Sequence, residues 1–487
     1  MKKIYFFFVL LSTFGALKAQ YNTPDLGLRW NLDSIAVHDP ETVVVSDTAY
    51  YILKGFFVSL TDSLFIEKNS VVKIAKDVEV RVKGHFTAKA DSIIITAVNI
   101  DSTYKGLYFE ETASAWFENT SVSYGGGIRV ITANFQMYNC EVSYNASGSS
   151  TGSAIGFSRG KPIVKNSVFK YNFNPALSSG ANTPVAAIFE GNYFEANNQR
   201  GNNRPQINMG PSGEDTIKII NNVVIGDRAL TVVGGISASS LLGTENHIVI
   251  SGNIVKDNRY AVTTAGPNTT GIIADNVLED NNTETNPNNG GSGISLYNTG
   301  LVHITNNQIR RNLWGVTIIG TAMANLGSDD QDDYNEGGNV FSENGNGGVT
   351  YALFNNTPNT IKALHNCWIE GQASTKEQAD SVIFDVADIS TLGEVIYDPF
   401  ECGITTSLTD LSNKDLMIFP NPAHDFIQLN LDQAGRVRIY DVNGRLVSDR
   451  GNLSDSSHQL SINLNPGMYL ITVTSSEKMK VRKLLVE

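Results

Sequence analysis

The chain has 487 residues and carries 49 acidic against 36 basic side chains, a formal net charge of −13. A chain of this length buries a core without disulfides, and so acidic a surface repels nucleic acid, which we exclude as a partner. The cysteines Cys140, Cys367 and Cys402 allow one disulfide, Cys367 to Cys402, with Cys140 as a buried thiol; three reduced thiols fit the sequence equally well.

The first 19 residues have the layout of a secretory signal peptide. Lys2 and Lys3 precede an apolar run over residues 4–17, and Ala19 supplies the small residue before the cut. The run is too short to span a membrane comfortably, and no later stretch is apolar enough. We expect a mature chain that starts near Gln20, outside the cytoplasm. Its charge is −16, because residues 1–19 hold three lysines and no acid.

One short phrase recurs through the middle of the chain, for example NIVKDN at 253–258, NVLEDN at 276–281 and NVFSEN at 339–344. Its third residue is always apolar, in the series Val122, Val142, Phe169, Phe194, Val224, Val255, Leu278, Ile309, Phe341 and Trp368. It closes three residues later, at Gly125, Asn145, Asn172, Asn197, Asp227, Asn258, Asn281, Asn312, Asn344 and Gly371. Irregular repeats of roughly 20 to 32 residues indicate a solenoid.

Short segments rich in Val and Ile flank each phrase. Those before it include PIVKN, IKIINN, HIVISGN, GIIADN, VHITNN and TIKALHN; those after it include GIRVI, ALTVV, AVTT, GISLY, GVTII and GVTYA. They read as strands bounded by Asn and Gly, and none has a helical period. The sequence therefore predicts an all-β fold, a right-handed parallel β-helix over residues 20–403, with residues 21–60 as its N-terminal cap and roughly 13 coils.

The recurring Asn at the close of the phrase has two expected roles in such a fold. A sharp corner between strands needs a residue with positive φ, which Asn and Gly adopt at the lowest cost. Asn side chains stacked in successive coils also form a hydrogen-bonded ladder. The apolar third residue is expected to point inward. On this interpretation the phrase is mainly scaffold rather than an active site.

The pattern changes after Cys402. Residues 404–413, ITTSLTDLSN, are polar and lack the repeat, so they are predicted to be a linker. Residues 414–487 contain alternating strands separated by Pro-Asn-Pro, Asn-Gly and Pro-Gly turns. These features predict a small antiparallel, immunoglobulin-like β-sandwich.

Residues 414–487 also carry several motifs in order: PNP at 420–422, YDVNGR at 440–445, LNPGMYL at 464–470 and KLLV at 483–486. In these motifs the segment resembles the C-terminal sorting domain of cargo of the type IX (Por) secretion system of Bacteroidetes. The sorting-signal residues would be Pro420, Asn421, Pro422, Gly444, Gly467, Tyr469, Leu470 and Lys483. The resemblance implies recognition by the secretion machinery, passage through the outer membrane, removal of the domain, and secretion or attachment to the cell surface. The alternative is an ordinary immunoglobulin-like binding module.

The sequence of the repeat region indicates a function less specifically than that of residues 414–487 does. It resembles secreted parallel β-helix proteins such as the pectate lyases, which implies an extended polysaccharide as a partner. We favour a noncatalytic polysaccharide- or surface-binding rod, expected to be a monomer, over a polysaccharide lyase or glycoside hydrolase, or a structural envelope protein. Hydrolysis would need paired carboxylates, which no motif supplies. The lyase motif WIDH has only a partial counterpart in Trp368-Ile369-Glu370-Gly371, so no catalytic residue is assigned.

Two charged groups stand out in the repeat region. Residues 327–338, GSDDQDDYNEGG, depart from the repeat, and Asp329, Asp330, Asp332 and Asp333 could hold Ca²⁺, which takes six to eight oxygen ligands. The spacing is not that of an EF-hand, and a solvated acidic insertion is the alternative. Arg310 and Arg311 are expected to face Glu279 and Asp280 across neighbouring coils as a solvated charge ladder.

Overall fold

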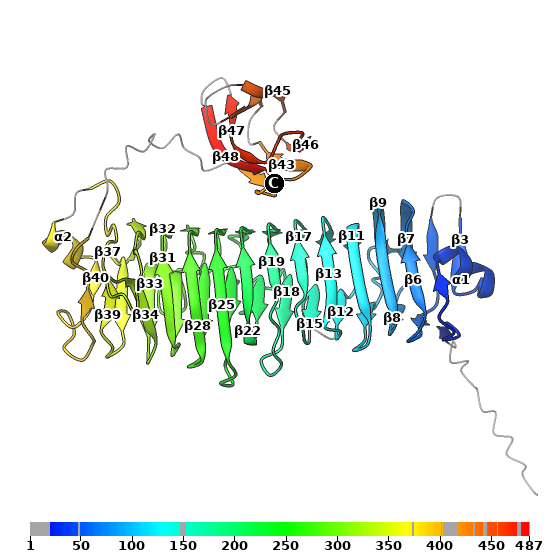
Figure 1. The fold of residues 1–487 in the computed structure, drawn as a ribbon, viewed down its shortest axis with the longest axis horizontal. Helices are drawn as coiled ribbons and strands as arrows, with labels where there is room; N and C mark the ends of the chain where they lie inside the picture. The colour runs from blue at the N-terminus through cyan, green and yellow to red at the C-terminus, as the bar shows by residue number, and fades with distance from the viewer. Residues whose placement is uncertain are drawn as a thin grey trace, which may run out of the picture.

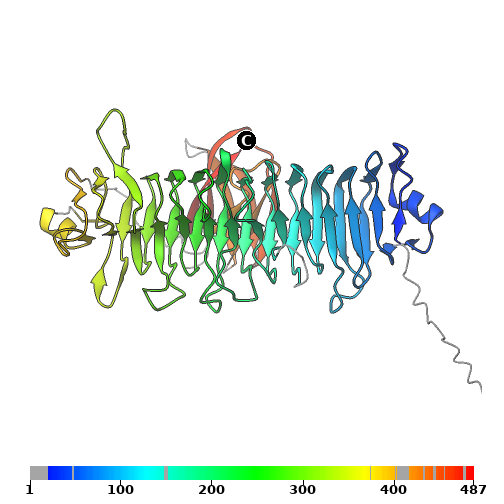
Figure 2. The same ribbon diagram turned by 90° about the horizontal axis from the view of Figure 1, so that it is seen from below.

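The computed structural model describes residues 20–46, 49–146, 152–372, 375–400, 402, 416–431, 434–441, 446–454, 456–474 and 479–486. The predicted signal peptide, 1–19, and the predicted linker, 404–413, lie outside these residues. The described part is an all-β protein in which a long parallel β-helix is followed by a small β-sandwich (Figure 1). Figure 2 shows the coils following one another in chain order along the rod.

Three parallel sheets run along the rod, and each coil contributes one strand to each of them in turn. We name them sheets A, B and C. Sheet A has 14 strands. They are β1 (Tyr21–Asn22), β5 (Phe56–Val58), β8 (Glu79–Val82), β10 (Gly106–Phe109), β12 (Ile128–Val130), β15 (Ile155–Phe157), β18 (Leu177–Ser179), β21 (Ile207–Met209), β24 (Ile236–Ala238), β27 (Val262–Ala265), β30 (Ser292–Tyr297), β33 (Trp314–Ile319), β38 (Leu353–Asn356) and β40 (Ile383–Phe384).

Sheet B follows sheet A within each coil. Its strands are β2 (Arg29–Trp30), β6 (Ser63–Ile66), β9 (His85–Ala97), β11 (Ser114–Ser123), β13 (Asn134–Tyr138), β16 (Ile163–Lys165), β19 (Ile188–Glu190), β22 (Gly213–Ile220), β25 (Asn246–Ser251), β28 (Thr269–Ala274), β31 (Leu301–Thr305), β34 (Met323–Gly327), β39 (Ile361–Ala363) and β41 (Val395–Ile396).

Sheet C completes the coil, and the long strands β9 and β11 continue into it. Its other strands are β3 (Val43–Val45), β4 (Tyr50–Ile52), β7 (Ser70–Ile74), β14 (Glu141–Ser143), β17 (Val168–Lys170), β20 (Tyr193–Glu195), β23 (Val223–Ile225), β26 (Ile254–Lys256), β29 (Val277–Glu279), β32 (Gln308–Arg310) and β35 (Val340–Ser342). The pair β3 and β4 is antiparallel, whereas the other neighbours in the three sheets pair in parallel.

The predicted inward column is the core of sheet C. Its ten members, from Val122 to Trp368, are at most 1% exposed. Strand register places each member beside the next from Val122 to Phe341, and the rings of Phe341 and Trp368 stack with centroids 5.1 Å apart. Because like side chains stack on like along the rod axis, one apolar position repeated per coil builds a continuous core.

Two asparagine ladders flank this column, one at each end of the recurring phrase. The first joins Asn192, Asn222, Asn253, Asn276, Asn307, Asn339 and Asn366. Within it the side-chain amide of Asn276 donates to Asn307 Oδ1 at 2.9 Å and to the Ile250 carbonyl at 2.9 Å. The Asn276 Oδ1 in turn accepts from Asn253. Each buried amide therefore has its donors and its acceptor satisfied by the adjacent coils.

The second ladder differs from the expectation at one coil and in its backbone geometry. It runs through Asn145, Asn172, Asn197, Gln206, Asn258, Asn281, Asn312 and Asn344. Asp227 is not a rung: Gln206 takes its place, and an amide can donate and accept where a carboxylate can only accept. The expected positive φ is also wrong for these Asn residues, because it falls on the residue before each of them.

The residues that adopt this left-handed conformation are chemically varied. They are Tyr144, Tyr171, Ala196, Asp257, Asp280, Arg311 and Glu343, with φ between 50° and 58°. For non-glycine residues this conformation costs about 1–2 kcal/mol each. The next residue's buried amide, bonded above and below, holds the corner in place despite that cost. Apart from the buried Ala196, these side chains are at least partly exposed, so the position accepts varied residues.

Two strand predictions were wrong, both on sheet A. ALTVV at 229–233 forms no strand; the strand of that coil is β24, which follows it. GVTYA at 348–352 contributes β37 (Val349–Thr350), which pairs with β36 (Gly345–Asn346) in an antiparallel hairpin outside the stack. In both coils the segment after the corner is longer than usual, and the chain makes an excursion before it returns to the sheet.

Both ends of the rod are covered. At the N-terminal end, helix α1 (Leu32–His38) buries Ile35 against the first coil. Part of the predicted cap, 21–60, belongs to the stack of coils, because β1 and β2 already pair with β5 and β6. At the other end, helix α2 (Lys376–Asp380) and a disulfide between Cys367 and Cys402 close the last coil. Cys140 is a buried free thiol, and burial raises its pKa to about 12.

A buried carboxylate fixes the cap to the first coil. Asp62 is 0% exposed, and its oxygens accept from the backbone N–H groups of Asp25 at 2.9 Å, Leu26 at 3.1 Å and Leu28 at 2.8 Å. Burial alone would raise the pKa of Asp62. The hydrogen bonds outweigh that effect and hold the pKa below its usual value.

The C-terminal sandwich has a separate core. One sheet contains β42 (Met417–Phe419), β43 (Phe426–Asn430) and β46 (Ser457–Ser461). The other contains β44 (Gly435–Asp441), β45 (Leu446–Leu453), β47 (Gly467–Thr474) and β48 (Met479–Val486). All neighbours within the two sheets are antiparallel. The predicted β-sandwich is confirmed.

We expect Asn253→Ala to lower the free energy of unfolding by about 2–3 kcal/mol, since it removes one acceptor from the buried amide of Asn222 and one side-chain donor from Asn276. Denaturant unfolding followed by circular dichroism measures the change. Asn288→Ala, on an exposed loop, is the matched control and should be neutral. Equal effects of the two substitutions would show that the ladder does not stabilise the rod.

Asp62→Asn should lower the stability of the cap by about 2 kcal/mol near neutral pH, because it weakens three charge-assisted hydrogen bonds. The folded-state pKa of Asp62 lies below the unfolded value of about 3.9. Its contribution is therefore full above that pH and is lost as the pH falls through the folded-state pKa. Unfolding midpoints measured from pH 7 to pH 2 should converge for wild type and variant at the acidic end. The exposed Asp91→Asn serves as control, and a gap that widens on acidification would contradict the assignment.

Candidate functional site

The outer face of sheet A carries a groove of about 640 Å³ over its middle strands, β12 to β27. Its floor is one column of side chains in register: Arg129, Gly156, Ser178, Asn208, Ser237 and Thr263. In each strand the residues on either side of this position point into the core, so the middle residue must face outward. Loop residues, among them Arg204 and Leu241, border the floor.

The groove lining combines polar and apolar side chains, and arginine is its ionisable residue type. Its lining consists of Arg129, Gly156, Phe157, Ser158, Ser178, Ser179, Gly180, Ala181, Arg204, Asn208, Met209, Gly210, Ser237, Ser239, Leu241, Thr263 and Ala265. Among these described residues there is no carboxylate, histidine or lysine. Hydroxyl and amide groups offer hydrogen bonds to a polar chain, and the two guanidinium groups give the groove positive charge, which attracts carboxylate or sulfate groups.

These residues were not predicted from the sequence, although the pattern of residues that marks them was present. The strands IRV, IGF, LSS, INM, ISA and VTT each carry an apolar residue at the first position and a small or polar residue at the second. A column of this kind becomes visible only when the strands are aligned by coil. ISA, one of the six, was not recognised as a strand, because the strand of that coil was predicted at 229–233 instead.

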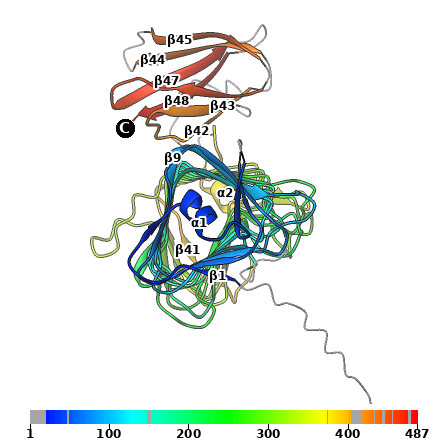
Figure 3. The ribbon, with the colours of Figure 1, turned by 90° about the vertical axis from the view of Figure 1, so that its right-hand side faces the viewer.

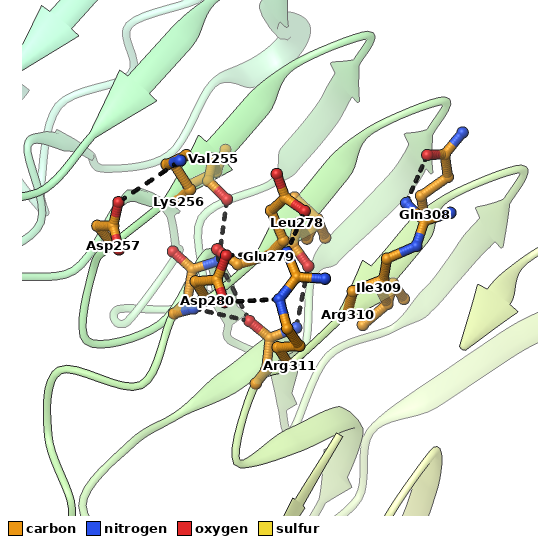
Figure 4. A network of polar contacts seen from close by, with 12 residues as sticks. Val255, Lys256, Asp257, Leu278, Glu279, Asp280, Gln308, Ile309, Arg310 and Arg311 are labelled. Atoms are coloured by element: carbon orange, nitrogen blue, oxygen red, sulfur yellow. Dashed lines mark hydrogen bonds and ion pairs between the residues drawn. The ribbon is translucent and has the colours of Figure 1, made fainter. Parts of the chain in front are cut away.

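The predicted charge ladder lies at the corner after sheet C. Arg311 donates through Nε to Asp280 Oδ1 at 2.8 Å and through Nη2 to Glu279, and Figure 4 shows its guanidinium turned towards both carboxylates. These bonds, with Asp280 first, raise the pKa of Arg311. Arg310 differs from the expectation, because it reaches Glu370, whose carboxylate accepts from its Nε at 2.7 Å. A guanidinium bound in this way cross-links neighbouring coils.

The partial WIDH counterpart is also structural. Trp368 belongs to the core column and is 1% exposed. The Arg310 guanidinium holds the pKa of Glu370 below its usual range, which keeps that carboxylate ionised and unsuited to act as a general acid. Both residues therefore have structural partners in the described part of this coil.

The acidic loop that could bind Ca²⁺ faces basic side chains. Asp329 pairs with His365 at 2.9 Å, Asp333 with His303 at 2.9 Å, and Asp330 with Lys362 at 3.4 Å. Asp332 is exposed. Within the described ranges, no group of three or more His, Cys, Asp or Glu side chains is arranged to hold a metal ion. The calcium site stays a prediction, and this geometry favours the solvated acidic insertion.

Seven of the eight predicted sorting-signal residues lie among the described residues, on the turn after β42 and on strands β47 and β48; Gly444 falls outside them. Asn421 connects the Pro420-Asn421-Pro422 turn to the last strand, with its Nδ2 donating to the Lys483 carbonyl at 2.9 Å. Its Oδ1 accepts from the Leu485 N–H at 2.7 Å. Strand β47, which holds Gly467, Tyr469 and Leu470, pairs with β48, which holds Lys483.

The motif residues therefore have structural tasks as well. The Tyr469 hydroxyl donates to the Asn465 carbonyl at 2.8 Å and closes the turn before its strand. Leu470 is 41% exposed and pairs directly with Lys483. Motifs from the first turn and the last strand of the domain thus meet through Asn421.

Comparison with known proteins is informative for this domain. Residues 417–487 match the family model of the secretion system C-terminal sorting domain. Neither the curated proteins nor the solved structures compared with the chain include a match. In the described part of the chain, no helix is long and apolar enough to cross a membrane. The sorting domain indicates export by the type IX machinery, with which it interacts, and secretion or attachment at the cell surface.

Asn421→Ala should destabilise the sandwich by about 1–2 kcal/mol, since it removes both hydrogen bonds between the first turn and β48. The thermal midpoint of the sandwich transition and the amount of protein outside the cell should both fall. Asn452→Ala, at an exposed position of β45, is the control. Identical export and stability of the two variants would show that the bond is dispensable.

Proposed function

We propose that the rod is a noncatalytic binding protein that holds an extended, acidic polysaccharide along the groove of sheet A at the cell surface. The observation that carries the proposal is the groove lining: hydroxyl and amide groups in register over successive coils, with Arg129 and Arg204 as its ionisable side chains. A long polar floor fits a chain molecule better than a compact ligand. The two arginines favour a glycan that bears carboxylate or sulfate groups.

Charge supports this choice of ligand. The chain as a whole is acidic, so a polyanion is repelled from most of its surface. The groove combines positive charge with the absence of carboxylates among its lining residues. An acidic glycan would therefore find its favourable site here, and its binding should weaken as salt is added.

The lining also argues against catalysis in this groove. Hydrolysis needs two carboxylates flanking the scissile bond, and lyase chemistry needs a base beside a neutralised uronate. The groove has two arginines and none of the carboxylates that would hold a metal ion next to them. Binding without cleavage is therefore the function that the geometry supports best.

Affinity electrophoresis tests the proposal with the full chain, with polygalacturonate as the acidic glycan and a neutral β-glucan as comparison. Wild-type protein should be retarded by polygalacturonate, and Arg129→Gln combined with Arg204→Gln should weaken retention by about tenfold or more, because it removes charge-assisted hydrogen bonds. Arg228→Gln, outside the groove in an ion pair with Asp257, is the matched control and should bind like wild type.

The glycan is recovered after incubation and its chain length measured. Shortened chains would make the protein an enzyme and overturn the noncatalytic proposal. Unchanged chains without any retention would leave a structural envelope protein. Retention that survives the double substitution would place the binding surface elsewhere on the rod.

A further inference from the structure

The outer face of sheet C has an unusual composition over five successive coils. In each strand the middle residue points into the core, so the residue before it faces outward. These outward residues are Val168, Tyr193, Val223, Ile254 and Val277. We call them the apolar stripe. A continuous apolar run on the outside of an exported protein is costly unless something covers it.

The sandwich covers this stripe. The ring of Phe419, at the end of β42, stacks on Tyr193 with centroids 4.2 Å apart and planes inclined by 14°. Tyr193, Val223 and Phe419 form one buried cluster with exposures of 1%, 8% and 4%, and Val168 and Ile254 pack against it. The end-on view shows the sandwich beside the rod with β42 on the facing side (Figure 3).

Two further observations extend the contact along the rod. Arg482, on β48, lies within electrostatic reach of Glu279 at the end of β29. Towards the other end, a cavity of about 390 Å³ separates Trp116 and Tyr138 on the rod from Phe426 on the sandwich. The contact is therefore close at Phe419 and open at its margin, which is the geometry of an anchor residue rather than of a fused core.

We propose that the apolar stripe is a docking surface for the chain's own sorting domain, that Phe419 is its anchor, and that removal of the domain uncovers the stripe. The tether between the two parts spans residues 403–415. A tether of this length gives an effective concentration in the millimolar range, so one aromatic anchor with apolar neighbours suffices to keep the two parts together. The inference is independent of any glycan.

The charge of the two contact sides agrees with this occupant. Arg482 of the sandwich approaches the acidic Glu279 on the rod. A second copy of the rod would instead bring two stripes of the same acidic chain face to face. The sorting domain also occupies the stripe within the same chain, where no association step between molecules is needed. These points favour the sorting domain over a second rod.

Chemical crosslinking of the full chain tests the arrangement. Lys165→Cys and Asp425→Cys are combined in one variant, because both residues line the cavity beside the anchor and their replacement leaves Tyr193 and Phe419 in place. A short bismaleimide joins thiols that lie close together, and the product should be an intramolecular 165–425 bridge, identified by peptide mass mapping. The matched control combines Asp425→Cys with Ile272→Cys, at an exposed outward position on sheet B. Equal bridging in both variants would overturn the proposal, and bridges between chains would favour a second copy.

A second measurement separates docking from folding. A protease site is placed within residues 404–413 of the full chain, and the cut protein is passed over a sizing column. Sandwich and rod should co-elute, and Phe419→Ala should lower the co-eluting fraction by about tenfold at dilute concentration. Met468→Ala, at an exposed position of the sandwich, should not. Unchanged thermal transitions in both variants show that they fold, and co-elution of Phe419→Ala equal to wild type would refute the anchor.

Binding of an apolar fluorescent dye reports on the stripe itself. The cut and separated rod should bind more dye than the intact chain, because Val168, Tyr193, Val223 and Ile254 become accessible. Tyr193→Ser combined with Val223→Ser should abolish that increase. An intact chain that already binds as much dye as the separated rod would show that the stripe is never covered.

Discussion

The rod depends on a single constraint: every buried polar group at its corners must find a partner in the coil above or below. Two columns of side-chain amides meet that constraint, and each amide both donates and accepts along the rod axis. The repetition follows from this requirement, since a rung that could not do both would leave its neighbours unsatisfied in a dry interior. The place of Gln206 in the ladder shows that the amide group matters and its position in the sequence does not.

The same constraint explains which parts of the architecture were predictable. A corner amide recurs in most coils between Asn145 and Asn366, and an inward apolar residue in the coils from Val122 to Trp368, so the period, the parallel stack and the core column were all visible in the sequence. The replacement of Asp227 by Gln206 as a rung of the ladder was not predictable. It depends on the path that the chain takes after Asn197, which brings Gln206 to the corner. The positive φ was misplaced by one residue, since Asn suits both a ladder and a left-handed turn and only the geometry separates the two roles.

The groove and the apolar stripe both lie on outward residues, which the ladders leave free to vary. On sheet A they form a polar groove with two guanidinium groups, and on sheet C an apolar stripe under the sandwich. Neither surface was predicted, because a column of single residues some 20 to 30 positions apart has no local signature. The sorting motifs were recognisable because they are local, and the structure adds that Asn421 links the first motif to the last.

The disulfide at the end of the rod also determines when the last coil is closed. A parallel stack ends in a coil with unpaired strand edges, and such edges template aggregation with other chains. The bond between Cys367 and Cys402 closes that coil, and it forms in an oxidising compartment rather than in the cytoplasm. The last coil is thus sealed only after the chain has left its place of synthesis. Closure of the last coil is thereby coupled to the export that the sorting domain indicates.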